Sequence, residues 1–185
     1  MKLPLMAALA GLLALPAAAD GYWEYRDWRA FSETIDTGED LRRTCTAVTG
    51  GDGLPSLRLT ISNGDGGPPD HYPEPMLYEN APRGHGTQVQ NGLAVAFVFD
   101  RQAAFYGIAN GWFDEEGFAH AEAGPRWQDA LRMLRWMKAG QALEIRLLHP
   151  YQEGAVVMNA SLSGFTAAYG KMMDECGFSI ELPAG

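Results

Sequence analysis

The chain has 185 residues, of which 46% are hydrophobic and 20% are charged, and its formal net charge is −9. This composition supplies enough apolar side chains for one folded domain and disfavours intrinsic disorder. The acidic excess disfavours a nucleic-acid partner, because phosphate binding needs a basic surface, and gives no electrostatic attraction to an anionic membrane.

Residues 1–19 have the three parts of a bacterial secretory signal peptide. A basic start precedes an apolar run over 3–15, and Ala17 and Ala19 are the small residues of a cleavage site. The run is shorter than the roughly 20 residues that a membrane-spanning helix needs, and no later segment is apolar enough to insert. We expect cleavage to leave residues 20–185 as a single β-rich domain in the periplasm or outside the cell.

An aromatic-rich segment opens this expected domain. Simple alternation places Trp23 and Tyr25 on one face of a strand, and Tyr22 and Trp28 on the other. An edge strand does not bury both faces equally, so some of these rings are candidates for an exposed surface that stacks on sugars or anchors a protein. The alternative is that they belong to the core of a β-sandwich.

Strand-like segments follow, separated by turns rich in Gly, Asp and Asn. They cover 41–48, 56–62, 93–99, 103–109 and 118–122. In the second segment Leu57, Leu59 and Ile61 share one face. The segment 93–99 is apolar on both faces, so we expect it in the centre of a sheet.

A loop rich in Gly and Pro, over 63–86, interrupts these strands. It carries Asp70, His71 and Glu74, and His85 stands between two glycines. A carboxylate beside an imidazole can act as a general base or bind a metal. The spacing matches no metal-ligand motif, so we expect a solvated loop without metal. Asp70, His71 and His85 remain candidates for a ligand surface.

Two helices are expected in the last third of the chain. Over about 125–139, apolar residues recur at helical spacing between a proline and a glycine. Over about 164–176, a second helix follows Ser163, a residue type favoured as N-cap. Strands over 141–148 and 155–162 separate them. The whole pattern predicts a mainly β, single-domain antiparallel β-sandwich or bent sheet with two packed helices.

Cys45 and Cys176 are the two cysteines of the chain. In an oxidising compartment two cysteines of one domain usually pair. Neither belongs to a Cys-x-x-Cys motif or has a histidine nearby in sequence, and the helical stripe places Cys176 on a buried face. These observations predict a structural Cys45–Cys176 disulfide.

The C-terminal third also resembles a known family. Residues 161–168 read Ser-Leu-Ser-Gly-Phe-Thr-Ala-Ala, and they follow a helix that ends over 136–140 and a strand over 143–146. This arrangement is similar to the C-terminal signature of the invasion-associated locus B family, and it also resembles type VI secretion-associated periplasmic proteins. The resemblance covers about 130–178. It implies a β-rich envelope protein and brings no catalytic residue.

No catalytic constellation is recognisable in the sequence. It has neither a Gly-x-Ser-x-Gly elbow nor a Gly-Lys-Ser/Thr phosphate loop. We therefore expect a non-catalytic accessory protein without cofactor that binds an envelope protein or a cell-wall component. The alternatives are a hydrolase of envelope glycan or peptide, acting through the loop 63–86, and a carbohydrate-binding module using the aromatic segment. The sequence leaves the oligomeric state open.

Overall fold

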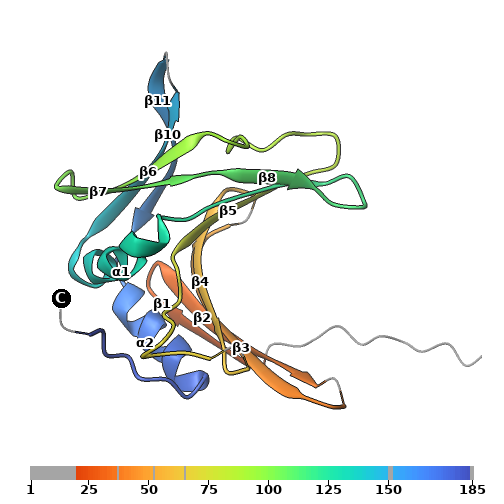
Figure 1. Cartoon of the computed structure of the whole chain (residues 1–185), viewed down its shortest axis with the longest axis vertical. Helices are drawn as coiled ribbons and strands as arrows, with labels where there is room; N and C mark the ends of the chain where they lie inside the picture. The colour runs from red at the N-terminus through yellow and green to blue at the C-terminus, as the bar shows by residue number, and fades with distance from the viewer. Residues whose placement is uncertain (1–19, 37, 52, 65, 150–151, 184–185) are drawn as a thin grey trace, which may run out of the picture.

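The computed structural model describes residues 20–36, 38–51, 53–64, 66–149 and 152–183. The predicted signal peptide, residues 1–19, lies outside these ranges. Within them, eleven strands form two antiparallel sheets, accompanied by two α-helices and one 3-10 helix (Figure 1).

The larger sheet, sheet A, has seven strands in the order β1-β2-β3-β4-β5-β9-β8. In that order they cover Gly21–Tyr25, Trp28–Asp36, Leu41–Gly50, Ser56–Ser62, Met76–Ala81, Ala119–Ala123 and Asn110–Phe113. Successive side chains point to opposite faces of a strand, so one face of sheet A joins the core and the other meets solvent. Leu57, Leu59 and Ile61 of β4 are buried together, as their alternation predicts.

The smaller sheet, sheet B, has four strands in the order β11-β10-β6-β7. In that order they cover Gln152–Ser161, Ala142–His149, Ala94–Phe99 and Ala103–Ile108. Strand β6 lies between β10 and β7, and its side chains at Val95, Phe97 and Phe99 are buried. The prediction that this segment is central in a sheet is confirmed.

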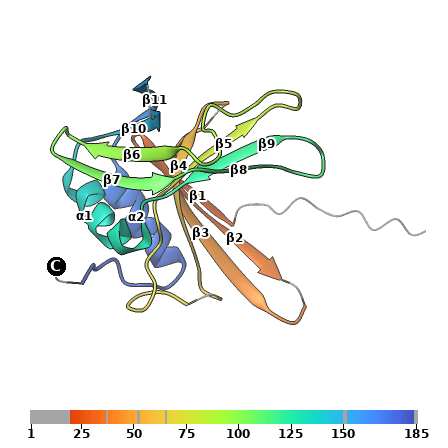
Figure 2. The same ribbon diagram turned by 45° about the horizontal axis from the view of Figure 1, so that its top comes forward.

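The helices lie close to their predicted positions. A 3-10 helix, η1 (Trp127–Asp129), leads into α1 (Ala130–Ala139), and α2 (Phe165–Glu175) follows β11. The first helix begins later than predicted because Arg126 is extended, with a ψ of 140°. Helix α2 packs across β1, β2 and β3 (Figures 1 and 2).

The N-cap of α2 is Gly164, so the prediction of Ser163 at that position is wrong. Gly164 has a φ of 94°, in the left-handed region that favours glycine. A Cβ there would lie 1.8 Å from the backbone oxygen of Tyr25. The Ser163 hydroxyl instead accepts a hydrogen bond of 3.1 Å from Arg26. The close approach of the β1–β2 turn thus decides which residue begins the helix.

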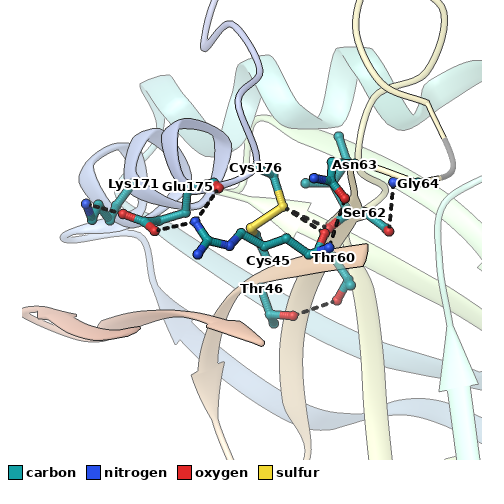
Figure 3. The surroundings of a disulfide bond; sticks show 11 residues. Cys45, Thr46, Thr60, Ser62, Asn63, Gly64, Lys171, Glu175 and Cys176 are labelled. Carbon is teal, nitrogen blue, oxygen red and sulfur yellow. Dashed lines mark hydrogen bonds and ion pairs between the residues drawn. A yellow bond between two sulfur atoms is a disulfide. The ribbon is translucent and has the colours of Figure 1, made fainter. Parts of the chain in front are cut away.

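A disulfide joins Cys45 of β3 to Cys176, directly after α2, with the Cα atoms 6.0 Å apart (Figure 3). The predicted pairing is confirmed, and both residues are buried. Beside the cross-link, Glu175 Oε2 lies 3.5 Å from Arg43 Nη1, and Glu175 Oε1 lies 2.5 Å from Lys171 Nζ. Together these contacts hold the end of α2 on β3.

The sheets and helices enclose one hydrophobic core. Its largest fully buried side chains include Trp28, Phe97, Phe99, Phe165 and Tyr169. Burial raises the pKa of the Tyr169 hydroxyl to about 12, because the phenolate would lose its hydration. The protein is a mainly β, single-domain antiparallel β-sandwich with a bent sheet A and two packed helices, which confirms the predicted fold class.

The β6–β7 turn contains a residue whose replacement should stabilise the protein. Asp100 and Arg101 have φ of 46° and 59°. The Asp100 carboxylate accepts backbone hydrogen bonds of 3.0 and 2.9 Å from Gln141 and Ala142, so this side chain has a structural role. Arg101→Gly should raise the free energy of unfolding by about 0.5–1 kcal/mol in urea titration, because glycine adopts positive φ without strain. Asp100→Gly, the control, should lower it; a decrease for Arg101→Gly would contradict the argument.

Candidate functional site

The solvent face of sheet A is concave. It lies opposite α2, and Figure 1 shows the sheet bending around it from the β2–β3 hairpin to β8. Figure 2 shows the β2–β3 and β8–β9 hairpins as diverging arms at the two ends of this bend. Strand alternation directs Arg58 and Thr60 of β4 to this face, because Leu57 and Leu59 point into the core.

A groove of about 660 Å³, the sheet A groove, lies on this face. One cross-strand row supplies part of it: Phe31 of β2 pairs with Thr46 of β3, and Thr46 pairs with Thr60 of β4. The two threonine hydroxyls form a hydrogen bond of 3.1 Å. The row therefore places hydroxyl groups beside an aromatic ring.

Arg58 and Tyr78 form a stacked pair in the same groove. The guanidinium carbon of Arg58 lies 3.1 Å from the centroid of the Tyr78 ring. Among the residues that the structure describes, no carboxylate forms an ion pair with Arg58. A guanidinium held flat on a ring keeps its N–H edge available for two parallel hydrogen bonds to a carboxylate. Arg58 is thus the group in the groove best suited to an acidic ligand.

The Gly- and Pro-rich loop brings only part of its predicted residues to the groove. His71 and Glu74 line it, with Glu33 and Met76 from β2 and β5. Asp70 and His85 are exposed and are not among the lining residues.

These loop residues do not form a hydrogen-bonded catalytic pair. Within the described part of the chain, no hydrogen bond or ion pair links Asp70, His71, Glu74 and His85 to one another. A general base is normally oriented by such a partner. His71 and Glu74 line the groove, where their side chains can donate hydrogen bonds to a ligand and accept them from it.

The predicted aromatic patch of the N-terminal segment is divided between the two faces of sheet A. The chain turns between Tyr25 and Trp28, and these two residues are paired across β1 and β2. They therefore share one face with Trp23, whereas simple alternation puts Trp28 on the opposite side. Trp28 is fully buried and donates its indole N–H to the backbone oxygen of Ser161 at 2.9 Å, so for this ring the alternative of a core position holds.

Trp23 and Tyr25 are partly buried against the core on the α2 side. The ammonium of Lys171 lies 4.2 Å from the centroid of the Trp23 ring. Tyr22 is 53% exposed, points to the concave face and pairs with Phe31, a lining residue of the sheet A groove. Its hydroxyl donates a hydrogen bond of 2.9 Å to Glu24, which raises the pKa of Tyr22.

A second polar cluster lies on the same face, towards β8. The His120 ring nitrogens lie 2.8 Å from Asn80 Oδ1 and 2.8 Å from Asp114 Oδ2, and the ring stacks on Trp112 with the centroids 5.4 Å apart. Hydrogen bonds from His120 and from the backbone N–H of Phe118 hold the pKa of Asp114 below its usual value. These contacts orient the imidazole rigidly.

Sequence reasoning missed Phe31, Arg58, Thr60 and Tyr78 as site residues. A signal was available for two of them, because the alternation that buries Leu57, Leu59 and Ile61 places Arg58 and Thr60 together on the opposite face.

Over the described ranges, no three His, Cys, Asp or Glu side chains come together as a metal site would require. In the same ranges no helix has the length and hydrophobicity needed to cross a bilayer.

Neither a protein-family model nor a curated protein sequence matches the chain. Among solved structures, the fold is similar to the crystal structure of invasion associated protein B from Bartonella henselae, with 13% sequence identity and a TM-score of 0.48. The match covers 84% of this chain and 98% of that chain. The resemblance of residues 130–178 to type VI secretion-associated proteins stays a prediction.

Proposed function

We propose that the protein is a secreted, non-catalytic binding protein of the bacterial cell envelope, and that the sheet A groove holds its ligand. The observation that carries this proposal is the guanidinium of Arg58, stacked on Tyr78 in a groove where no carboxylate of the described residues pairs with it. The predicted signal peptide and the disulfide support a location outside the cytoplasm, because disulfides persist in oxidising compartments.

Arg58 and the aromatic and hydroxyl side chains of the lining favour a cell-wall glycan that carries carboxylates, such as the muramyl-peptide units of peptidoglycan, and the lining carboxylates Glu33 and Glu74 would accept hydrogen bonds from its hydroxyl and amide groups. Phe31 and Tyr78 offer flat apolar rings for the C–H faces of sugars. The hydroxyls of Thr46 and Thr60 can bind sugar hydroxyls and amides. Arg58 would take the carboxylate through charge-assisted hydrogen bonds.

Titration with soluble muramyl-peptide fragments tests this proposal. The wild-type chain should bind them saturably in isothermal titration calorimetry, and Arg58→Gln should weaken binding by at least about tenfold, because hydrogen bonds to charged groups contribute about 1.5–3 kcal/mol. Arg135→Gln is the matched control, since Arg135 lies on α1 and donates to the backbone oxygen of Pro183 at 2.7 Å. Absence of saturable binding, or an unchanged affinity for Arg58→Gln, would overturn the proposal.

One observation favours a hydrolase as the second candidate: His71 and Glu74 line the groove in which the ligand would lie. A hydrolase would shorten the fragments during the titration, and His71→Ala would stop the reaction with binding retained. The proposed binding protein leaves the fragments intact, as mass spectrometry of the recovered ligand would show.

A further inference from the structure

The outward face of sheet B is hydrophobic and is exposed mainly on β7, whereas Ala96 in the middle of β6 is 4% exposed. All three outward positions of β6 and all three of β7 are hydrophobic; they are Ala94, Ala96, Val98, Ala104, Tyr106 and Ile108. Tyr106 and Ile108 are 47% and 65% exposed. Helix α1 does not cover them, because its Trp136 packs on Phe99, which points to the opposite face. A contiguous exposed hydrophobic face of this kind is typical of an interface.

The only charges along β10 on this face form a pair. Glu144 and Arg146 are two residues apart on β10, point outward and form an ion pair. Hydrogen bonding to Arg146 lowers the pKa of Glu144, so the carboxylate is ionised at neutral pH. On β10 this face therefore carries one charge of each sign, with the Arg101 cation acting on Glu144 as well, whereas the chain as a whole has a formal net charge of −9. Two acidic chains can approach each other here without the repulsion that the rest of the surface imposes.

We infer that this face is the interface of a two-fold symmetric dimer, in which a second copy of the chain packs sheet B on sheet B. The two-fold axis lies in the plane between the two packed sheets, perpendicular to β10, and crosses that strand between Glu144 and Arg146. It brings Glu144 of each copy opposite Arg146 of the other. A symmetric interface must be self-complementary, and a neighbouring pair of opposite charges satisfies that condition.

The same axis places large hydrophobic side chains of one copy opposite small ones of the other. Glu144 is in register with Val98 and Ala104, and Arg146 is in register with Ala96 and Tyr106. The axis exchanges these two rows, so Tyr106 of one copy faces the small Ala104 of the other. Large side chains opposite small ones allow sheets to pack face to face at about 10 Å.

The same axis also fixes what the outer rows face. Leu148, Ala94 and Ile108 form the next row on one side of the axis. The axis places Leu148 of this row opposite Ala142 at the other end of the face, beside a hollow of about 640 Å³ whose lining includes Ala142 and the charged residues Asp100, Arg101 and Glu144. Leu148 of each copy therefore lies over the partly polar hollow of the other.

The molar mass of oxidised residues 20–185 in solution tests the dimer. Light scattering should give twice the protomer mass, and Tyr106→Glu should give the protomer mass, because a buried unpaired carboxylate opposes packing. Phe113→Glu is the matched control: Phe113 lies on β8 of sheet A and is 72% exposed, so that variant should remain dimeric. A wild-type monomer at the highest soluble concentration overturns the inference.

Two charge variants test the position of the axis. Arg146→Glu and Glu144→Arg each place like charges opposite one another and should raise the dimer Kd at least about tenfold. An equimolar mixture of the two variants restores both opposite-charge contacts and should dimerise like the wild type. Circular dichroism and thermal unfolding establish that each variant is folded. A mixture no more dimeric than the separate variants overturns the proposed two-fold arrangement.

Discussion

Removal of the Cys45–Cys176 disulfide is expected to lower the free energy of unfolding by about 4 kcal/mol. The bond joins residues separated by 131 positions, so it restricts a long loop in the unfolded chain. In the folded protein it holds the end of α2 on β3, beside the ion pairs of Glu175 (Figure 3). The loss should therefore affect the whole domain, because α2 covers the core face of β1, β2 and β3.

Urea unfolding of the wild type and of the double variant Cys45→Ala/Cys176→Ala measures this loss. Alanine is the appropriate replacement because both positions are buried and a serine hydroxyl would lack a partner. Wild type with a reductant should match the double variant, and the reductant should leave the double variant unchanged. A difference of less than about 1 kcal/mol between oxidised wild type and variant would contradict the structural role of the bond.

Trp28→Ala should lower the free energy of unfolding by about 3–5 kcal/mol, because it leaves a large cavity in the core. The indole is fully buried, and its ring lies 4.8 Å from that of Phe165 in an edge-on contact. Its N–H donates to the backbone oxygen of Ser161 on β11. Trp28 thus contacts sheet A, sheet B and α2 at once.

Urea titrations of Trp28→Phe and Trp127→Ala provide the comparison. Trp28→Phe keeps a ring and loses the hydrogen bond, so its cost should be about 1–3 kcal/mol. Trp127 is 76% exposed on η1, and its replacement by alanine should change stability by no more than about 0.5 kcal/mol. Equal effects of Trp28→Ala and Trp127→Ala would show that Trp28 is not a core residue.

The fold class followed from local patterns in the sequence. The doubly apolar segment 93–99 predicted a central strand, and the stripe of the last helix predicted the burial of Cys176. Local alternation failed at Trp28, because a tight turn after Tyr25 folds β2 back onto β1 and brings both rings to one face. It also failed at Ser163, because only glycine fits against the Tyr25 backbone at the start of α2.

The candidate site was harder to predict from the sequence than the fold class, because the pairing of strands brings its residues together. Tyr22 and His71 were predicted as surface residues, and both lie at or beside the sheet A groove. Arg58 and Tyr78 are far apart in sequence, and they stack only because β4 pairs with β5 at one end. The prediction of a loop over the whole of 63–86 is wrong, because β5 covers Met76–Ala81 and pairs with β4 and β9, and without this strand the Arg58–Tyr78 contact could not be foreseen.

The most direct test of the proposed ligand surface is nuclear magnetic resonance of labelled residues 20–185 titrated with a muramyl-peptide fragment. The proposal predicts saturable shift changes for the sheet A groove, led by Phe31, Thr46, Arg58 and Tyr78, with β6 and β7 unaffected. Shift changes confined to sheet B, or none at saturating fragment, would contradict the central claim that the concave face of sheet A binds a cell-wall glycan.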